Sequence, residues 1–193
     1  PKRLVAHSRQ GGDSIQFKRM PRTVEFPELG GGGDILNDSV VDGLIAKCGR
    51  EFDLVTADGS LDIENNHAAA ETVNMHIMIR ECLIAIMVQR IGGDFVLKVF
   101  DIETLPLAGL IQIVSTLYAE TAVIKPLTSR ATNGEKYVVF RGFTGCLDSA
   151  QRVSTMLSGL DPSTTLRSIV ALDDSDVQVF KSLHAFFCKT QLA

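Results

Sequence analysis

Three charged residues of this 193-residue chain stand at or near the ends of apolar stretches, and their types suit proton transfer. Asp58 directly follows Phe52–Ala57, Lys98 lies late in Phe95–Phe100, and Glu135 begins a further stretch. A lysine among apolar residues has to reach a strand end or pair with an acid. A lysine held by acids can help to deprotonate a weakly acidic alcohol. The residues leave a structural alternative open, in which Lys98 only forms an ion pair with one of the two acids.

Alternating strands and helices are predicted to hold these residues. The predicted strands are Arg3–His7, Phe52–Ala57, Phe95–Phe100, Thr121–Lys125 and Tyr137–Phe143. The predicted helices are Asp38–Cys48, Ala68–Arg90, Leu107–Tyr118, Leu147–Leu157 and Val177–Phe187. Strands that alternate with helices of these lengths favour an α/β fold with a mostly parallel sheet. Because the strands are almost continuously apolar, both faces of the sheet are expected to be covered.

One connection departs from the parallel rule. Only about ten residues separate Thr121–Lys125 from Tyr137–Phe143, whereas a parallel crossover needs about a dozen or more. The last two strands are therefore predicted to be antiparallel. The site of an open α/β sheet lies at the carboxyl ends of its parallel strands, and an antiparallel strand starts at that edge. Asp58, Lys98 and Glu135 are thus predicted to converge on one edge of the sheet.

Composition and charge restrict the function classes. The formal net charge is -4, so binding to RNA would need local basic patches rather than an overall positive field. Basic residues near the start of the chain offer one such patch, with a solvated surface as the alternative: Lys2, Arg3, Arg9, Lys18, Arg19 and Arg22. The widely spaced cysteines predict free thiols in a reducing compartment and no metal site. No apolar run reaches the ~20 residues that span a bilayer, so no membrane association is expected.

Three sequence blocks resemble a known family. They are Asp-Leu-Val-Thr-Ala-Asp-Gly at Asp53–Gly59, Gly-Gly-Asp-Phe-Val-Leu-Lys-Val-Phe-Asp at Gly92–Asp101, and Lys-Pro-Leu-Thr-Ser-Arg-Ala-Thr-Asn-Gly-Glu-Lys-Tyr-Val-Val at Lys125–Val139. Together they resemble the FtsJ/RrmJ-like methyltransferases, and most of all the cap-specific mRNA (nucleoside-2′-O-)methyltransferases. The third block is the most specific for the mRNA-cap branch. The order and spacing match from about His7 to Phe143.

The resemblance implies a Rossmann-like methyltransferase fold and methyl transfer from S-adenosylmethionine to a ribose 2′-hydroxyl of capped mRNA. The family's catalytic set is Lys-Asp-Lys-Glu, and Asp58, Lys98 and Glu135 fill its last three places. The family's first lysine and its cofactor glycine loop lie upstream of the matched region. The chain is therefore expected to lack the first strand and that loop. A preceding segment or a partner chain is expected to complete the fold.

The resemblance also assigns binding residues. Gly33, Asp34 and Ile35 stand where family members carry an element that meets the cofactor's adenine, with the acid accepting from its amino group. Asp58 is expected near the methionine end of the cofactor. Taken on the glycines alone, Gly30–Gly33 is merely a flexible loop. Thr128, Ser129, Arg130 and Asn133 are expected to face the RNA, and the alternative for them is turn chemistry.

A non-catalytic RNA- or protein-binding subunit is the alternative function. A nicotinamide-dependent oxidoreductase is disfavoured, because no G-x-G-x-x-G turn is present. The chain is expected to form a single domain over residues 1–193, with residues 144–193 as its helical C-terminal extension. Capped mRNA is the expected partner and DNA is not, because DNA lacks the 2′-hydroxyl. The expected compartment is nuclear or cytoplasmic, without secretion.

Overall fold

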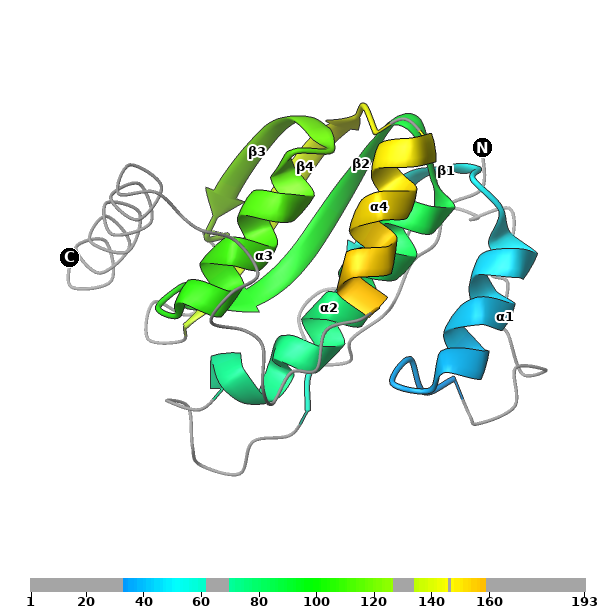
Figure 1. The fold of residues 1–193 in the computed structure, drawn as a ribbon. Helices are drawn as coiled ribbons and strands as arrows, with labels where there is room; N and C mark the ends of the chain where they lie inside the picture. Colours follow the sequence, from blue (N-terminus) through cyan, green and yellow to red (C-terminus); the bar gives the residue numbers. More distant parts are fainter. Residues whose placement is uncertain (1–32, 62–69, 127–133, 146, 159–193) are drawn as a thin grey trace, which may run out of the picture.

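The computed structural model describes residues 33–61, 70–126, 134–145 and 147–158 (Figure 1). In chain order its elements are α1 (Asp38–Cys48), β1 (Phe52–Ala57), α2 (Ala70–Val88), β2 (Gln89–Phe100), α3 (Leu105–Ser115), β3 (Tyr118–Ile124), β4 (Glu135–Phe143) and α4 (Leu147–Ser158). The predicted strand Arg3–His7 and the predicted helix Val177–Phe187 lie outside the described residues.

The four described strands form one sheet in the order β1-β2-β4-β3. β1 and β2 pair in parallel, and β4 pairs antiparallel with both β2 and β3. Three strands therefore run in one direction, and β4, inserted between β2 and β3, runs in the other. This arrangement confirms the predicted mostly parallel sheet with one antiparallel strand, and the fold is that of an α/β protein.

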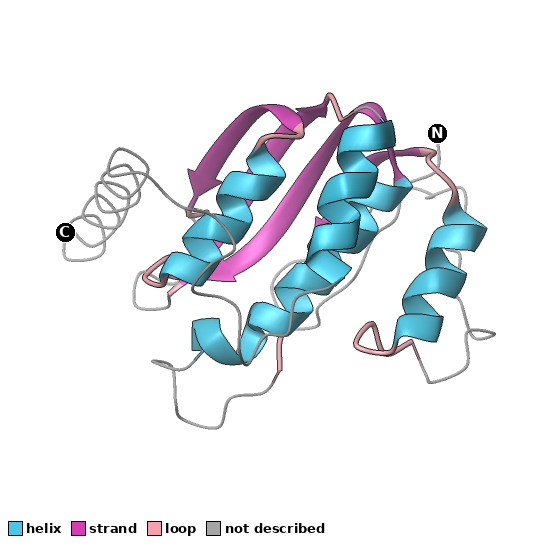
Figure 2. Cartoon of the chain, in the orientation of Figure 1, coloured by secondary structure: helices cyan, strands magenta, loops and turns pink. Residues whose placement is uncertain are grey.

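The described helices pack on one face of the sheet. α2 contacts β2, α3 contacts β3, and both α1 and α4 pack against α2. Figure 2 shows α2, α3 and α4 in front of the strands. On β2, Phe95, Leu97 and Val99 are fully buried, while the residues between them are only half-buried. Of the two faces predicted to be covered, one is thus covered by the helices of the described residues.

The core beneath these helices is aromatic as well as aliphatic. Phe95 on β2 stacks on Phe140 of β4, with ring centroids 5.5 Å apart. Tyr118 contacts Phe140 and Phe143, and its hydroxyl donates to Gln89. Burial is the main cause that raises the pKa of Tyr118, which keeps this hydroxyl a donor. The interlocked core fixes the register of β2 and β4, and that register positions the candidate site.

Most elements predicted within the described residues are confirmed. For α1, the residues at its two ends explain why it forms where predicted. Asn37 accepts a hydrogen bond from the Ser39 amide at 3.0 Å and caps α1. Gly49, with φ of 58°, ends that helix. The predicted range Phe52–Ala57 coincides with β1, and the predicted Leu147–Leu157 ends one residue before α4 does.

Two helix boundaries were wrong. The predicted helix Ala68–Arg90 ends at Val88, because Gln89 already pairs with Phe52 and begins β2. The Gly92–Gly93 pair lies inside β2, at a bulge where the register with β1 shifts. A Cβ atom at Gly93 would lie 2.9 Å from the Phe52 carbonyl oxygen, so only glycine fits there.

The second wrong boundary concerns α3 and the strand after it. α3 runs from Leu105 to Ser115, with Thr104 as its N-cap, instead of from Leu107 to Tyr118. Tyr118 belongs to β3, which therefore begins three residues before the predicted Thr121. The aromatic contacts of Tyr118 with β4 draw it into the sheet, and tertiary packing overrides the apolar helix pattern there.

Candidate active site

The Asp58–Lys98 pair lies at the carboxyl ends of β1 and β2. The parallel register places Ala57 beside Leu97, so the next residues of both strands are neighbours. The Lys98 ammonium lies 2.7 Å from the Asp58 Oδ1 atom and donates a hydrogen bond to the Asp58 carbonyl oxygen at 2.9 Å. The side chains of Lys98 and Asp58 are 12% and 31% exposed. The pair is thus shielded enough to be strong and open enough to meet a substrate.

Glu135 and Tyr137 stand on the same face of the neighbouring strand. Lys98 pairs with Tyr137 across the β2–β4 ladder, and Phe100 pairs with Glu135. The Tyr137 hydroxyl donates to the Glu135 carboxylate. Burial, followed by the hydrogen bond and the charge of Glu135, raises the pKa of Tyr137, so this hydroxyl stays protonated. Side chains one diagonal step apart on a ladder are within reach of long groups, which places Glu135 near Lys98.

A second cluster holds the start of β4 in place. Asp101 has a φ of 43°, in the left-handed region, and its amide donates to the Gly134 carbonyl oxygen at 2.8 Å. The Lys136 ammonium pairs with the Asp101 carboxylate and also donates to the Gly134 carbonyl at 3.3 Å. A Cβ atom at Gly134 would collide with the Asp101 carboxylate, so any other residue there would displace the partner of Lys136. The cluster fixes the backbone immediately before Glu135.

Lys125, at the end of β3, touches the same backbone from the other side. Its ammonium donates to the Glu135 carbonyl oxygen at 3.1 Å. Desolvation and then the nearby Lys136 charge lower the pKa of Lys125, while Asp101 and Glu135 act in the opposite direction. Glu135 is therefore anchored through its main chain, and its carboxylate is oriented by Tyr137.

The loop after β1 is held by α2. The Gly59 amide donates to Glu81 Oε1 at 2.7 Å, and the Leu61 amide donates to Asn74 Oδ1 at 2.6 Å. Glu81 is only 8% exposed, and burial raises its pKa from 4.5 to about 7. The Gly59 hydrogen bond and the Lys98 charge oppose this rise. Sequence reasoning missed Glu81, although an acid within the apolar stripe of a helix is a signal that could have found it.

The element Gly33–Ile35 directly precedes α1. The Asp34 side chain is exposed, and its Oδ1 accepts the Leu36 amide at 2.9 Å. Ile35 packs against the core, and the start of α1 is tied to α2 by an Arg80–Asp38 ion pair of 2.5 Å. Figure 1 shows the start of α1 at the same end of the molecule as the carboxyl ends of β1 and β2. A carboxylate fixed on a structured turn is suited to accept from an amino group.

The comparison with known proteins agrees with this geometry. A model of the FtsJ-like methyltransferase family matches residues 3–143, well over half of the chain. The chain belongs to the FtsJ-like methyltransferase family. The resemblance predicted from three sequence blocks is therefore confirmed, and so is the predicted methyltransferase fold.

Several curated proteins similar to this chain are named cap-specific mRNA (nucleoside-2′-O-)-methyltransferases. The chain is 37% identical over 134 residues to cap-specific mRNA (nucleoside-2′-O-)-methyltransferase 1 of Trypanosoma cruzi, a match that covers 67% of this chain and 37% of the relative. It is 34% identical over 97 residues to the mouse protein of the same name, covering 50% and 12%. It is 32% identical over 107 residues to the cap-specific methyltransferase of Autographa californica nuclear polyhedrosis virus, covering 55% and 41%. The chain spans about two-fifths or less of the length of these relatives.

The structure brings together only some of the residues predicted for the site. It brings Asp58 and Lys98 into contact, and it sets Glu135 on the same face of the next strand. Gly33, Asp34 and Ile35 form a turn on a separate element. The four residues expected to face RNA, namely Thr128, Ser129, Arg130 and Asn133, lie outside the described residues.

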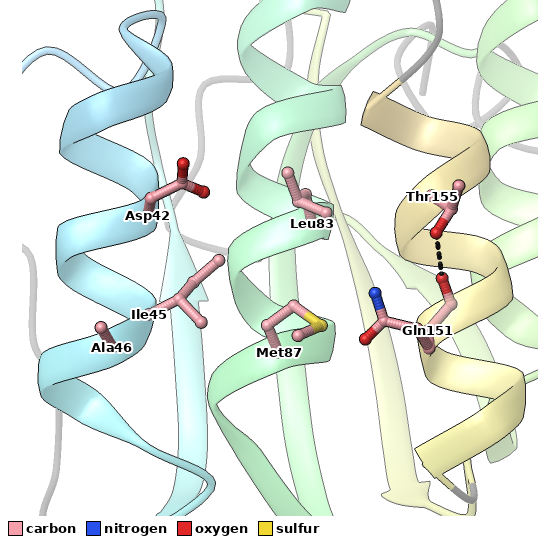
Figure 3. Close-up of a pocket in the computed structure, with 7 residues that line it drawn as sticks. All are labelled: Asp42, Ile45, Ala46, Leu83, Met87, Gln151 and Thr155. Carbon is pink, nitrogen blue, oxygen red and sulfur yellow. Dashed lines mark hydrogen bonds between the residues drawn. The ribbon is translucent and has the colours of Figure 1, made fainter.

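A cavity of about 410 Å³ lies elsewhere, between α1, α2 and α4 (Figure 3). Its walls are largely apolar, with Ile45, Leu83 and Met87 among the residues that line it. The Thr155 hydroxyl donates to the Gln151 carbonyl at 2.9 Å, a bond within α4. The cavity is an open depression between helices, whereas Lys98 lies on the other face of the sheet. Among the described residues, no group of acids, histidines or cysteines could hold a metal ion, and no helix is long and apolar enough to cross a membrane.

Proposed function

We propose that this chain carries the catalytic sheet edge of an S-adenosylmethionine-dependent methyltransferase that acts on a ribose 2′-hydroxyl of capped mRNA. Family membership supports methyl transfer, and the names of the similar proteins support the cap as the target. The observation that carries the proposal is the partly exposed Asp58–Lys98 pair, with Glu135 on the same face of the neighbouring strand. Such a pair suits a reaction whose difficult step is to make an alcohol nucleophilic.

Lys98 is the residue proposed to act on the 2′-hydroxyl. Its Nζ atom would accept the proton of the 2′-hydroxyl as the oxygen attacks the methyl carbon; this step needs the amine form and leaves the ammonium that Asp58 holds. The Asp58 contacts hold the ammonium in one orientation. Glu135, oriented by the Tyr137 hydroxyl, would add a second negative charge beside the proton. Positioning of this kind can contribute about 7–11 kcal/mol to catalysis.

The residues present fit part of an S-adenosylmethionine site. The exposed Asp34 carboxylate, held on its turn by the Leu36 amide, can accept from the adenine amino group, with Gly33 and Ile35 on either side. Asp58 would lie near the methionine end. When bound, S-adenosylmethionine supplies a methyl group activated by its positively charged sulfur. The proposal includes a preceding segment or a partner chain that completes the cofactor site.

RNA is proposed to approach along the segment that connects β3 to β4. Thr128, Ser129, Arg130 and Asn133 stand in that segment, directly before the anchored Glu135. The guanidinium of Arg130 suits a phosphate or the face of a cap guanine. DNA is not an expected partner, because it lacks the acceptor hydroxyl.

The packing of α4 bears on the domain boundaries. α4 packs against α2, and its Ala150 is fully buried in the common core. This packing supports the proposal that residues 144–193 extend the same domain rather than form another. A nuclear or cytoplasmic location stays a prediction, because cap methylation can take place in either compartment.

The test is methyl transfer by the full protein to a short capped RNA, with the product located by nuclease digestion and mass spectrometry. A matched RNA with a single 2′-deoxy nucleotide at the acceptor position is the control. We expect methylation of the first RNA and none of the second. Equal methylation of both would contradict a 2′-hydroxyl target. Calorimetric binding of S-adenosylmethionine and S-adenosylhomocysteine to the same protein separates a missing cofactor site from an inactive one.

A further inference from the structure

The peptide group that joins Asp58 to Gly59 is held from both sides. On one side, the Lys98 ammonium donates to the Asp58 carbonyl oxygen at 2.9 Å. On the other side, the Gly59 amide of the same peptide group donates to Glu81 Oε1 at 2.7 Å. Because a peptide group is planar, these two bonds together fix the orientation of its plane. Glu81 and Lys98 are thus linked through a single peptide group.

The Glu81 carboxylate packs so closely on Gly59 that a side chain at position 59 would collide with it. A Cβ atom at position 59 would lie 2.6 Å from Glu81 Oε1 and 2.9 Å from the Ile77 side chain. Glycine is therefore required for the carboxylate to approach the backbone this closely. The packing fixes the Glu81 carboxylate against the residue that follows Asp58.

The second carboxylate oxygen of Glu81 lowers the stability of the fold. Oε2 is buried and has no hydrogen-bond partner within the described part of the chain. A buried carboxylate that is only partly bonded costs free energy, and an apolar residue would fill this stripe of α2 at lower cost. Such a cost is typical of a residue retained for a function rather than for stability.

We propose that Glu81 is a positioning residue that orients Lys98 through the Asp58–Gly59 peptide group. A negative charge on Glu81 polarises the peptide, so that the Asp58 carbonyl becomes a stronger acceptor for the Lys98 ammonium. The main chain of Asp58 is fixed at the same time, and with it the carboxylate that pairs with Lys98. The inference rests on the proposed function, because Lys98 is the group expected to act on the 2′-hydroxyl.

The charged groups that face Glu81 allow its charge to change near neutral pH. Lys98 on β2 favours the ionised form, Asp58 at the end of β1 disfavours it, and Cys82 adjoins it on α2. Burial outweighs the favourable contacts and raises the pKa of Glu81 to about 7. The polarisation of the peptide group should therefore increase as the pH rises through this value.

The first experiment compares Glu81→Gln with the wild type in the full protein. Gln keeps an acceptor for the Gly59 amide and a nearly identical shape but cannot ionise. We expect kcat for methyl transfer to fall between about 10- and 100-fold, the range in which small misplacements of catalytic groups act. The KM for S-adenosylmethionine should stay the same, and the rise of kcat near pH 7 should disappear. Glu120→Gln, the same change at an exposed pair on β3, should alter neither.

The second experiment does not depend on activity. In the wild type, the amide resonance of Gly59 should shift with an apparent pKa near 7, and in Glu81→Gln this titration should be absent. A Gly59 amide that does not titrate overturns the proposal, and so does a Glu81→Gln variant with unchanged kcat and pH profile. A wild-type protein that transfers no methyl group contradicts the proposed function, and the catalytic role of Glu81 falls with it. In that case the amide titration still decides whether Glu81 holds Gly59.

Discussion

Two lysine–aspartate pairs lie at the same edge of the sheet, on neighbouring strands, and they differ in the face that they occupy. Lys98 on β2 pairs with Asp58, and Lys136 on β4 pairs with Asp101. Lys98 stands opposite Tyr137, one rung from Lys136, so the two lysines point to opposite faces. The Lys98 side chain is 12% exposed, whereas that of Lys136 is 3% exposed and shares its face with the buried core.

The comparison shows that an ion pair alone does not identify a catalytic lysine. In both pairs the aspartate directly follows a strand, and in both the lysine also donates to a backbone carbonyl. Only Lys98 shares its face with a further acid on the next strand and with the tyrosine that orients that acid. The pair with the more exposed lysine, Lys98–Asp58, is therefore the candidate for chemistry, and the pair with the buried lysine, Lys136–Asp101, is the candidate for holding the backbone before Glu135.

The largest expected effect is the loss of activity in Lys98→Ala. Removing a general acid or base lowers kcat by about 10²- to 10⁴-fold, and we expect a loss in this range. Binding of S-adenosylmethionine should change little, whereas the melting temperature should fall somewhat, because the buried Asp58 Oδ1 atom loses the ammonium that pairs with it. Steady-state methyl transfer to capped RNA, with calorimetry and thermal melting as controls, checks this. Retained turnover would assign Lys98 to structure, like Lys136.

The contrast between the two pairs was only partly predictable from sequence. Asp58, Lys98 and Glu135 could be found because each is a charge set against apolar neighbours, and strand direction then predicts a common edge. The pair Lys136–Asp101 gave no such signal, because the left-handed backbone of Asp101 and the close approach of its carboxylate to Gly134 arise only from the folded turn.

The boundaries around β2 were missed for a related reason. Gln89 and Arg90 continue the helical pattern of α2, and nothing local marks the change to a strand. What decides it is a long-range contact, since Gln89 is buried and accepts from the Tyr118 hydroxyl. The apolar stripe of α2 could have singled out Glu81, but its contact could not be predicted locally, because its partner Gly59 lies on another element.

The second prediction concerns stability and pH. The folded-state pKa of Glu81, about 7, is raised above the ordinary 4.5, so the folded protein holds this proton more tightly than the unfolded chain. The stabilisation is present below pH 4.5 and is lost as the pH rises through about 7. The unfolding free energy of the wild type, relative to Glu81→Gln, should fall by up to about 3 kcal/mol over this window.

Urea denaturation of both proteins at several pH values measures this difference. The Gln variant serves as the reference because every other titrating group is shared. If the two curves stay parallel from pH 4 to 8, Glu81 does not titrate in that window. A falling difference, together with a rate that rises over the same window, would mean that the charge on Glu81 lowers stability while it increases activity.

The third prediction tests the structural role of the Lys136–Asp101 pair. Lys136→Met keeps much of the side-chain volume but removes the partner of Asp101 and the bond to the Gly134 carbonyl. We expect a loss of about 1–3 kcal/mol in unfolding free energy, because the buried Lys136 ammonium no longer bonds to the Asp101 carboxylate and the Gly134 carbonyl. Arg141→Met is the control, because its pair with Glu120 is exposed on both sides and such pairs contribute little. A Lys136→Met protein as stable as the wild type would contradict the structural assignment.

The smallest effect is expected from the two tyrosines of the chain, which separate catalysis from stability. Tyr137→Phe removes the donor to Glu135. A lost hydrogen bond to a charged group is worth at most about 1.5–3 kcal/mol, which limits the fall in kcat to about 10- to 150-fold. Tyr118→Phe removes a donor to Gln89 inside the core and should lower the unfolding free energy instead. Each variant should leave the other property nearly unchanged. If Tyr137→Phe loses stability but not rate, then Tyr137 fastens β4 as Lys136 does, and the difference between the two faces of the sheet is weaker than proposed.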